Sequence, residues 1–102
     1  MSIINITVRT FSSVEHAELF LNIAKANQIP KELSSYNLSA DFKIVQNIKQ
    51  KNQIISIWEY ENEIHMKKIR DCLSKFSKLP NSLNPKEIHY TTQVVHSSDK
   101  YS

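Results

Sequence analysis

Four segments of the chain alternate between apolar and polar side chains, the pattern that a β-strand produces. In the first, aliphatic side chains alternate with Asn5, Thr7 and Arg9; the aliphatic members are Ile4, Ile6 and Val8. The other three segments are residues 42–48, 53–60 and 88–94. Only the short polar run 49–52 separates the second segment from the third, so we expect these two strands to form a hairpin.

Two further segments place apolar residues at helical spacing. Ser12-Ser13-Val14-Glu15 predicts a capping box, in which Ser12 accepts a backbone hydrogen bond and Glu15 reaches back. The helix that follows should bury one face and end between Asn27 and Pro30; that face carries Ala17, Phe20, Leu21 and Ala24. A second helix should start at Asn62 as N-cap and run to Pro80, with an apolar stripe of Met66, Ile69, Leu73 and Phe76. Residues 31–41 are predicted to be a polar connector.

The order β-α-β-β-α-β predicts an α+β fold of the ferredoxin-like type, with a four-stranded antiparallel sheet and both helices on one face. Residues 1–96 should form this single domain, and residues 97–102, which show no pattern, a disordered tail. We expect the aliphatic side chains to face the helices: Ile4, Ile6, Val8, Ile44, Ile55, Ile57, Ile88, Tyr90 and Val94. The opposite face would then carry a mixed set: Asn5, Thr7, Arg9, Val45, Ile54, Trp58, Tyr60, His89, Thr91 and Gln93.

That mixed face is too apolar to stay in water, and a symmetric second copy is the commonest cover for such a face. Two sheets closing into one barrel would enclose a cavity with apolar walls and a few polar groups, the usual geometry of a ligand pocket. The pattern therefore predicts a homodimer with a small-molecule cavity on the non-helical face of the sheet.

Composition narrows the chemistry. The 102 residues include no glycine, which excludes a P-loop, a dinucleotide-binding turn and a G-x-S-x-G nucleophile elbow. The single cysteine, Cys72, fits a reducing compartment, and the sequence contains no run that would span a membrane, so we expect a cytoplasmic location without a membrane partner. Richness in Ile, Asn and Lys is typical of an AT-rich bacterial or phage genome.

Metal and nucleic-acid binding are not expected. The candidate ligands lack the paired spacing of a zinc site; they are His16, His65, Cys72, His89 and His96. The same strand order builds RNA-recognition domains, but those stack bases on aromatic residues of the first and third strands, and residues 4–8 contain no aromatic side chain. The net charge of +3 permits an acidic partner without requiring one.

The run Ile54-Ile55-Ser56-Ile57-Trp58-Glu59, followed by Asn62 and a helix, resembles the dimeric α+β barrel superfamily of antibiotic-biosynthesis monooxygenases and their heme-degrading relatives. In the heme-degrading branch, an Asn on the first strand, a Trp at the end of the third and a His on the second helix surround the substrate. The resemblance implies these catalytic roles for Asn5, Trp58 and His65, although His65 follows Trp58 by fewer residues than the family His does. It also implies oxygenase chemistry without a cofactor, with heme as a candidate substrate.

The residues suggest roles in such a site. Asn5 could donate to a substrate oxygen, Trp58 and Tyr60 could wall an aromatic ring, and His65 or His89 could handle a proton. Tyr60, His89 and Thr7 are the expected ligand-binding residues. Simpler interpretations stay open, with Trp58 as interface filler and Asn5 bonded to a neighbour.

A second function class also stays open. A short chain with no glycine and no complete catalytic set is also typical of a non-catalytic interaction protein, such as a phage-type inhibitor or regulator that binds a macromolecular partner.

Overall fold

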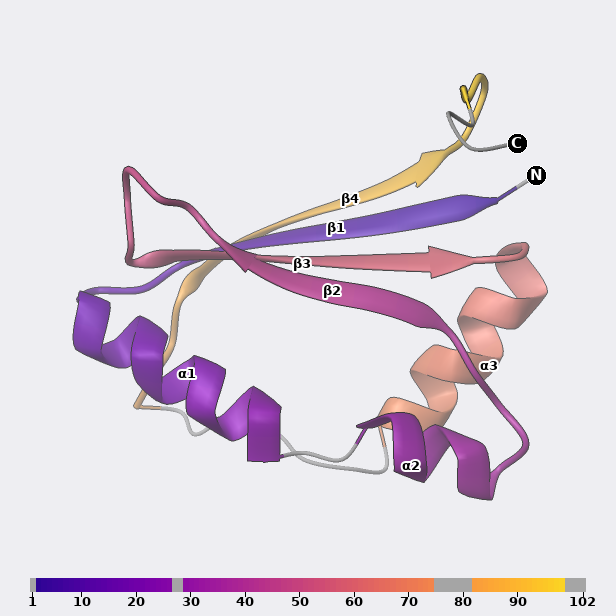
Figure 1. The fold of residues 1–102 in the computed structure, drawn as a ribbon, viewed down its shortest axis with the longest axis horizontal. Helices are drawn as coiled ribbons and strands as arrows, with labels where there is room; N and C mark the ends of the chain where they lie inside the picture. The colour runs from indigo at the N-terminus through magenta and orange to yellow at the C-terminus, as the bar shows by residue number, and fades with distance from the viewer. Residues whose placement is uncertain (1, 27–28, 75–81, 99–102) are drawn as a thin grey trace.

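The computed structural model describes residues 2–26, 29–74 and 82–98. Its elements, in chain order, are β1 (Ile3–Thr10), α1 (Val14–Ala26), α2 (Ile29–Ser35), β2 (Asp41–Gln46), β3 (Gln53–Tyr60), α3 (Glu63–Leu73) and β4 (Lys86–Gln93). The strands form one antiparallel sheet in the order β2-β3-β1-β4, and the helices lie on one face of it (Figure 1). The ferredoxin-like α+β fold predicted from the sequence is therefore confirmed.

Local sequence signals explain most element boundaries. The predicted hairpin of β2 and β3 is confirmed, and Asn62 caps α3 by accepting a hydrogen bond of 2.8 Å from the backbone N–H of His65. The cap of α1 was predicted one residue too early. Ser13 accepts from the backbone N–H of His16 at 3.1 Å, while the hydroxyl of Ser12 bonds the ring of His16 instead.

The connector predicted for residues 31–41 contains an additional helix, α2. Pro30 lies in its first turn, where the missing N–H removes no hydrogen bond. Leu33 is 1% exposed and packs against Ile69 and Cys72 of α3, so burial of this one side chain outweighs the polar character of the segment. The predicted extension of the second helix to Phe76 and Pro80 lies outside the described residues, as do positions 99–102 of the predicted tail.

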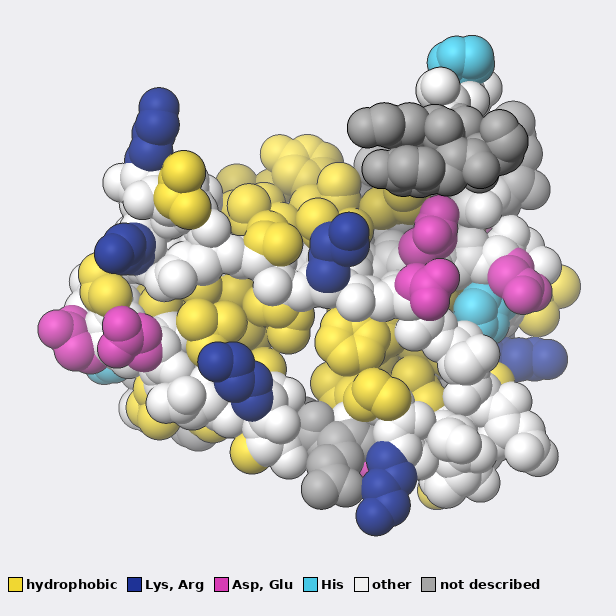
Figure 2. Space-filling view, viewed as in Figure 1, with side chains coloured by type: hydrophobic (Ala, Val, Ile, Leu, Met, Phe, Trp, Pro, Cys, Tyr) yellow, Lys and Arg dark blue, Asp and Glu magenta, His cyan; other side chains and the backbone are white. Residues whose placement is uncertain are grey.

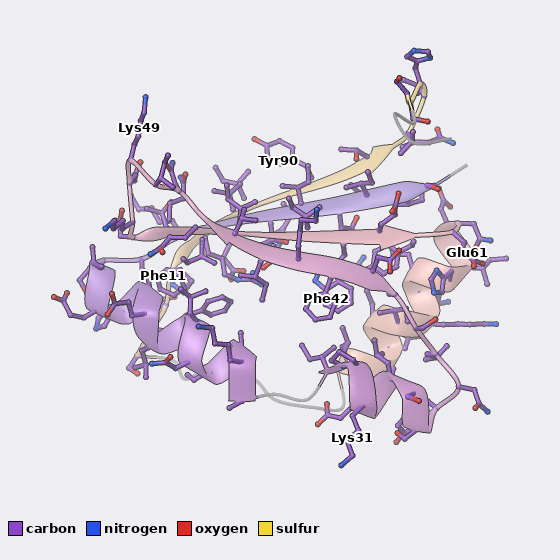
Figure 3. All side chains as sticks on the ribbon, in the orientation of Figure 1. Phe11, Lys31, Phe42, Lys49, Glu61 and Tyr90 are labelled. Carbon is purple, nitrogen blue, oxygen red and sulfur yellow. The ribbon has the colours of Figure 1, made fainter. Side chains whose placement is uncertain are left out.

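The predicted assignment of the two sheet faces is wrong for β1, β3 and β4, whereas on β2 Ile44 faces the helices and Val45 faces away from them, as predicted. Along β1, Asn5 pairs with Trp58, Thr7 with Ser56 and Arg9 with Ile54, and these side chains face the helices. The opposite face, here called the open face, carries Ile4, Ile6, Val8, Val45, Ile55, Ile57, Ile88 and Tyr90. Figure 3 shows the two faces, with Phe42 pointing toward the helices and Tyr90 pointing away from them, opposite to its predicted direction.

The physical reason for the reversal is that both faces are apolar enough to be buried, so a period of two residues cannot choose between them. In the structure, the helical side carries the large rings of Phe42, Trp58 and Tyr60, which lie in one row.

The core under the sheet is divided in two. One cluster joins Phe11 and Ile54 to α1, and its buried members are Phe11, Ala17, Phe20, Ile54 and Leu83. The other joins β1 and β3 to α2 and α3, and its buried members are Ile3, Leu33, Tyr60, Ile69 and Cys72. This division places α1 at one end of the sheet and α2 and α3 at the other (Figure 1). No helix within the described part of the chain is long and apolar enough to cross a membrane.

Candidate functional site

A cavity of about 440 Å³ lies between the sheet and the helices, where the two core clusters separate. Figure 2 shows the molecule hollowed between α1 and α2, with apolar side chains on both sides of the hollow. All four strands and all three helices contribute residues to its wall. The prediction that a cavity would lie on the non-helical face is therefore wrong, because the residues that were expected to line it point toward the helices.

Three aromatic rings form one wall of the cavity. Phe42 and Trp58 are cross-strand partners whose ring centroids lie 4.5 Å apart with an interplanar angle of 17°. Tyr60, two residues after Trp58 on the same face, continues the row at 6.2 Å and 12°. The helices add both apolar and charged side chains to the lining, among them Ile23 and Ala24 of α1 and Arg70 of α3. Such a slot favours a flat aromatic molecule, which can stack on the rings.

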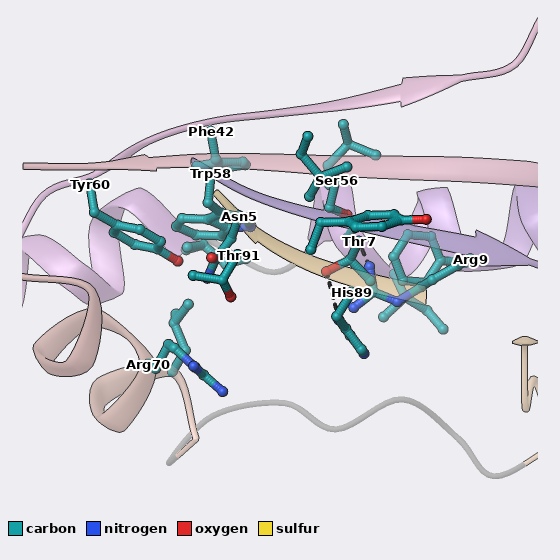
Figure 4. Close-up of a pocket in the computed structure, with 18 of the residues that line it drawn as sticks. Asn5, Thr7, Arg9, Phe42, Ser56, Trp58, Tyr60, Arg70, His89 and Thr91 are labelled. Carbon is teal, nitrogen blue, oxygen red and sulfur yellow. Dashed lines mark hydrogen bonds between the residues drawn. The ribbon is translucent and has the colours of Figure 1, made fainter. Parts of the chain in front are cut away.

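Asn5 presents an unsatisfied polar atom in this wall (Figure 4). Its Nδ2 donates to the sulfur of Met66 at 3.4 Å, a weak hydrogen bond, and its Oδ1 is buried without any hydrogen-bond partner in the structure. An unpaired buried acceptor costs stability, so it indicates a position where a ligand donates a hydrogen bond. The sequence predicted a donor at Asn5, whereas the structure leaves the acceptor free.

Arg9 lies at the other end of the cavity and is held by three neighbours. Its Nη1 donates to Ser56 Oγ at 3.0 Å, its Nε lies 3.1 Å from Glu87 Oε2, and its guanidinium lies 5.3 Å from the ring centroid of Phe20. Burial lowers the pKa of Arg9, and the charge of Glu87 partly offsets this by raising it. Because its charge is already paired, Arg9 shapes the cavity more than it attracts a ligand.

Tyr60 is 3% exposed and its hydroxyl lies near two groups of the cavity. Burial raises the pKa of Tyr60, while the charge of Arg70 and the amide of Asn5 both lower it. Tyr60 is thus neutral at physiological pH, and the charge of Arg70 reaches the end of the cavity formed by Trp58 and Tyr60.

The histidine that lines the cavity is His89, whereas the resemblance implied His65. Its Nδ1 shares a hydrogen bond of 3.0 Å with Thr7 Oγ1, and its Nε2 lies 3.7 Å from Glu87 Oε2. His65 does not line the cavity; its Nδ1 accepts from the backbone N–H of Glu61 at 3.0 Å and its Nε2 lies 2.7 Å from the backbone oxygen of Ser39. Because both ring nitrogens bond backbone groups, His65 holds these segments together and has a structural role.

The structure therefore brings together five of the six predicted site residues, which are Asn5, Thr7, Trp58, Tyr60 and His89, and separates His65 from them. Sequence reasoning missed Phe42 and Arg70. The hairpin register contained the signal for Phe42, since it places this ring opposite Trp58. Arg70 carried no signal, because only the packing of α3 shows which helix face meets the sheet.

A metal centre finds no support in the side chains. The residues that the structure describes contain no group of three or more His, Cys, Asp and Glu side chains arranged to hold a metal ion. Cys72 is buried in the core cluster under α3.

Comparison with known proteins supports the fold. No protein-family model and no curated protein matches the chain. Among solved structures, a dimeric ferredoxin-like protein from an uncultured marine organism superposes with a TM-score of 0.81 at 19% identity, over 97% of this chain and 92% of the other.

Two further solved structures are oxygenases by name. A Deinococcus radiodurans protein assigned as an antibiotic biosynthesis monooxygenase superposes with a TM-score of 0.63 at 11% identity over 100% of both chains. SnoaB, a cofactor-independent oxygenase from Streptomyces nogalater, superposes with a TM-score of 0.60 at 6% identity over 94% of this chain and 95% of the other. The resemblance to dimeric α+β proteins of the antibiotic-biosynthesis monooxygenase type thus holds for the fold.

Proposed function

We propose that this chain forms a homodimer through its open sheet faces and binds a small aromatic molecule in the cavity between sheet and helices. The observation that carries the proposal is the row of parallel rings formed by Phe42, Trp58 and Tyr60 beside the unpaired Oδ1 of Asn5. A cavity of about 440 Å³ lies within the range of pockets that take drug-sized ligands. An aromatic ligand with a hydroxyl group would stack on the rings and donate to Asn5.

The second copy is supported by the chemistry of the open face. Its centre is aliphatic, and Ile88 and Tyr90 remain 53% and 52% exposed in the single chain. Charged side chains lie at the margin of the same face: Lys43 is on the edge strand β2, where it pairs with Ile57, and Asp41 pairs with Glu59 across β2 and β3. An apolar centre with a charged rim is the usual anatomy of a protein interface, and the fold neighbour from the marine organism is dimeric.

We further propose that the bound molecule is oxidised by O₂ without a cofactor, as the name of SnoaB states for that neighbour. The chain offers groups that could assist. Asn5 would hold the hydroxyl of the substrate, the stacked rings would exclude water, and His89 could accept its proton. For a naphthol, uptake of one O₂ would yield a naphthoquinone and one water. Heme is a weaker candidate substrate, because His65 lies outside the cavity.

The test combines assembly with binding. Light scattering after size exclusion should give twice the chain mass, and calorimetric titration with 2-naphthamide should show one site per chain. Oxygen uptake with 1-naphthol above the spontaneous rate would support catalysis, and a Soret shift with hemin would favour heme instead. A monomer without affinity for 2-naphthamide would refute the proposal and favour the interaction-protein alternative.

A further inference from the structure

Arg70 differs from the other cation of the cavity in having no ionic or hydrogen-bonding partner among the residues that the structure describes. It lies on α3 and lines the cavity from the side opposite the sheet (Figure 4). Arg9 is held by Glu87 and Ser56, but no salt bridge or side-chain hydrogen bond involves Arg70 within residues 2–26, 29–74 and 82–98. An unpaired guanidinium beside an apolar slot can bind a carboxylate with two parallel hydrogen bonds.

The position of Arg70 relative to the ring row defines what it could bind. Its charge acts on the hydroxyl of Tyr60, which ends the row of Phe42, Trp58 and Tyr60. A flat ligand stacked on Trp58 would therefore bring a substituent at its edge into the field of Arg70. We propose that Arg70 makes this cavity selective for aromatic acids, with the ring on Trp58 and the carboxylate on Arg70. This inference rests on the proposed function, because it requires that the cavity bind an aromatic ring.

One carboxylate also lines the cavity and must be weighed. Glu32 lies on α2 and would repel an anionic ligand. However, the charges and bonds that act on Tyr60 come from Arg70 and Asn5, and Glu32 is not among them. The charged side chain that acts on the Tyr60 hydroxyl, at the aromatic end of the cavity, is therefore Arg70.

The experiment compares two ligands of equal shape and different charge. Calorimetric titrations at neutral pH would use 2-naphthoate, an anion, and 2-naphthamide, its neutral counterpart. We expect wild-type protein to bind naphthoate about tenfold more tightly, the effect of one partly exposed charge-assisted pair. Arg70→Gln should abolish this preference while leaving the affinity for naphthamide within about twofold, and thermal melting should confirm that the variant is folded.

A matched control separates a specific contact from overall charge. Lys68→Gln removes one positive charge from the same helix, at an exposed position that does not line the cavity. It should keep the preference for naphthoate. Equal affinities of the wild type for the two ligands, or an equal loss in both variants, would overturn the inference and leave the proposed function intact. Failure of both ligands to bind would instead refute the proposed function.

Glu32→Gln provides the opposite test. Removing this carboxylate should leave the preference for naphthoate unchanged or increase it slightly. If Glu32→Gln preferred naphthoate but the wild type did not, the carboxylate of Glu32 would dominate the cavity and the assignment to Arg70 would be wrong.

Discussion

The two faces of the sheet differ most clearly along β1. Toward the helices this strand presents Asn5, Thr7 and Arg9, whose polar side chains line the cavity. On the open face it presents three aliphatic residues: Ile4, Ile6 and Val8. The more apolar face is thus the one that the chain itself leaves uncovered. A single chain would have no reason for this arrangement, whereas a dimer would bury the aliphatic face between its two copies.

The largest expected effect on the difference between the two faces comes from placing a charge on the open face. Ile57 pairs with Ile6 on one side and Lys43 on the other, so it lies near the middle of this face. Ile57→Lys should convert the homodimer into a monomer, because a lysine there cannot be desolvated without a partner. Light scattering at several protein concentrations would measure it. Leu19→Lys, which changes an exposed residue of α1 that is 47% exposed, should remain dimeric.

Neighbouring isoleucines of β3 sharpen the comparison through stability. Ile54 is 0% exposed and belongs to the cluster under α1, whereas Ile55 faces the open side. In the Ile57→Lys background, where dimerisation should not contribute, Ile54→Ala should lower the free energy of unfolding by about 3 kcal/mol and Ile55→Ala by only about 1 kcal/mol. Urea denaturation would give both values. Similar losses in the free energy of unfolding would mean that the two faces bury these side chains to a similar extent.

The ring row on the helical face can be shortened without losing its reporter. Phe42→Leu keeps an apolar side chain and leaves Trp58 in place, but it removes one stacked ring. The affinity for 2-naphthamide should fall about three- to tenfold, the effect of one aromatic contact. Calorimetry would measure the loss, with Val45→Leu on the other face of β2 as control. An unchanged affinity would place the ligand elsewhere.

The smallest expected effect concerns pH. Burial raises the pKa of Tyr60 above 10.0, so the unfolded chain releases this proton before the folded protein does. The free energy of unfolding should therefore fall as the pH rises above about 10, and Tyr60→Phe should reduce that fall. Urea denaturation between about pH 8 and 11 would show it, with Tyr36→Phe, at a ring that is 50% exposed, as the control. Parallel curves for the wild type and Tyr60→Phe would contradict the assignment.

The sequence was sufficient for the order of the four strands and of α1 and α3, for the hairpin and for the cap at Asn62, because alternation and capping are local properties, but it missed α2. It could not orient the sheet, because Ile54 and Ile55 have the same side chain and only their packing distinguishes them. The site residues were nevertheless found largely together, since they lie on β1, β3 and β4, and reversing these strands moves all of them to the other face at once. Only His65 was misplaced, because helix position alone does not show where a side chain finds its hydrogen bonds.

His65 also has a consequence for how a ligand could reach the cavity. Its bonds tie the start of α3 to Glu61, just before the helix, and to Ser39, just before β2, and α2 packs on α3 through Leu33. Helix α1 is held separately: Phe11, just before it, exchanges two hydrogen bonds of 2.8 Å with Asn52, and Ala17 and Phe20 are buried in the other core cluster. We therefore expect a ligand to enter the cavity through a displacement of α1, which pivots about the segment near Phe11. Loosening that hinge at Asn52 should change the rates of ligand entry and exit more than the affinity.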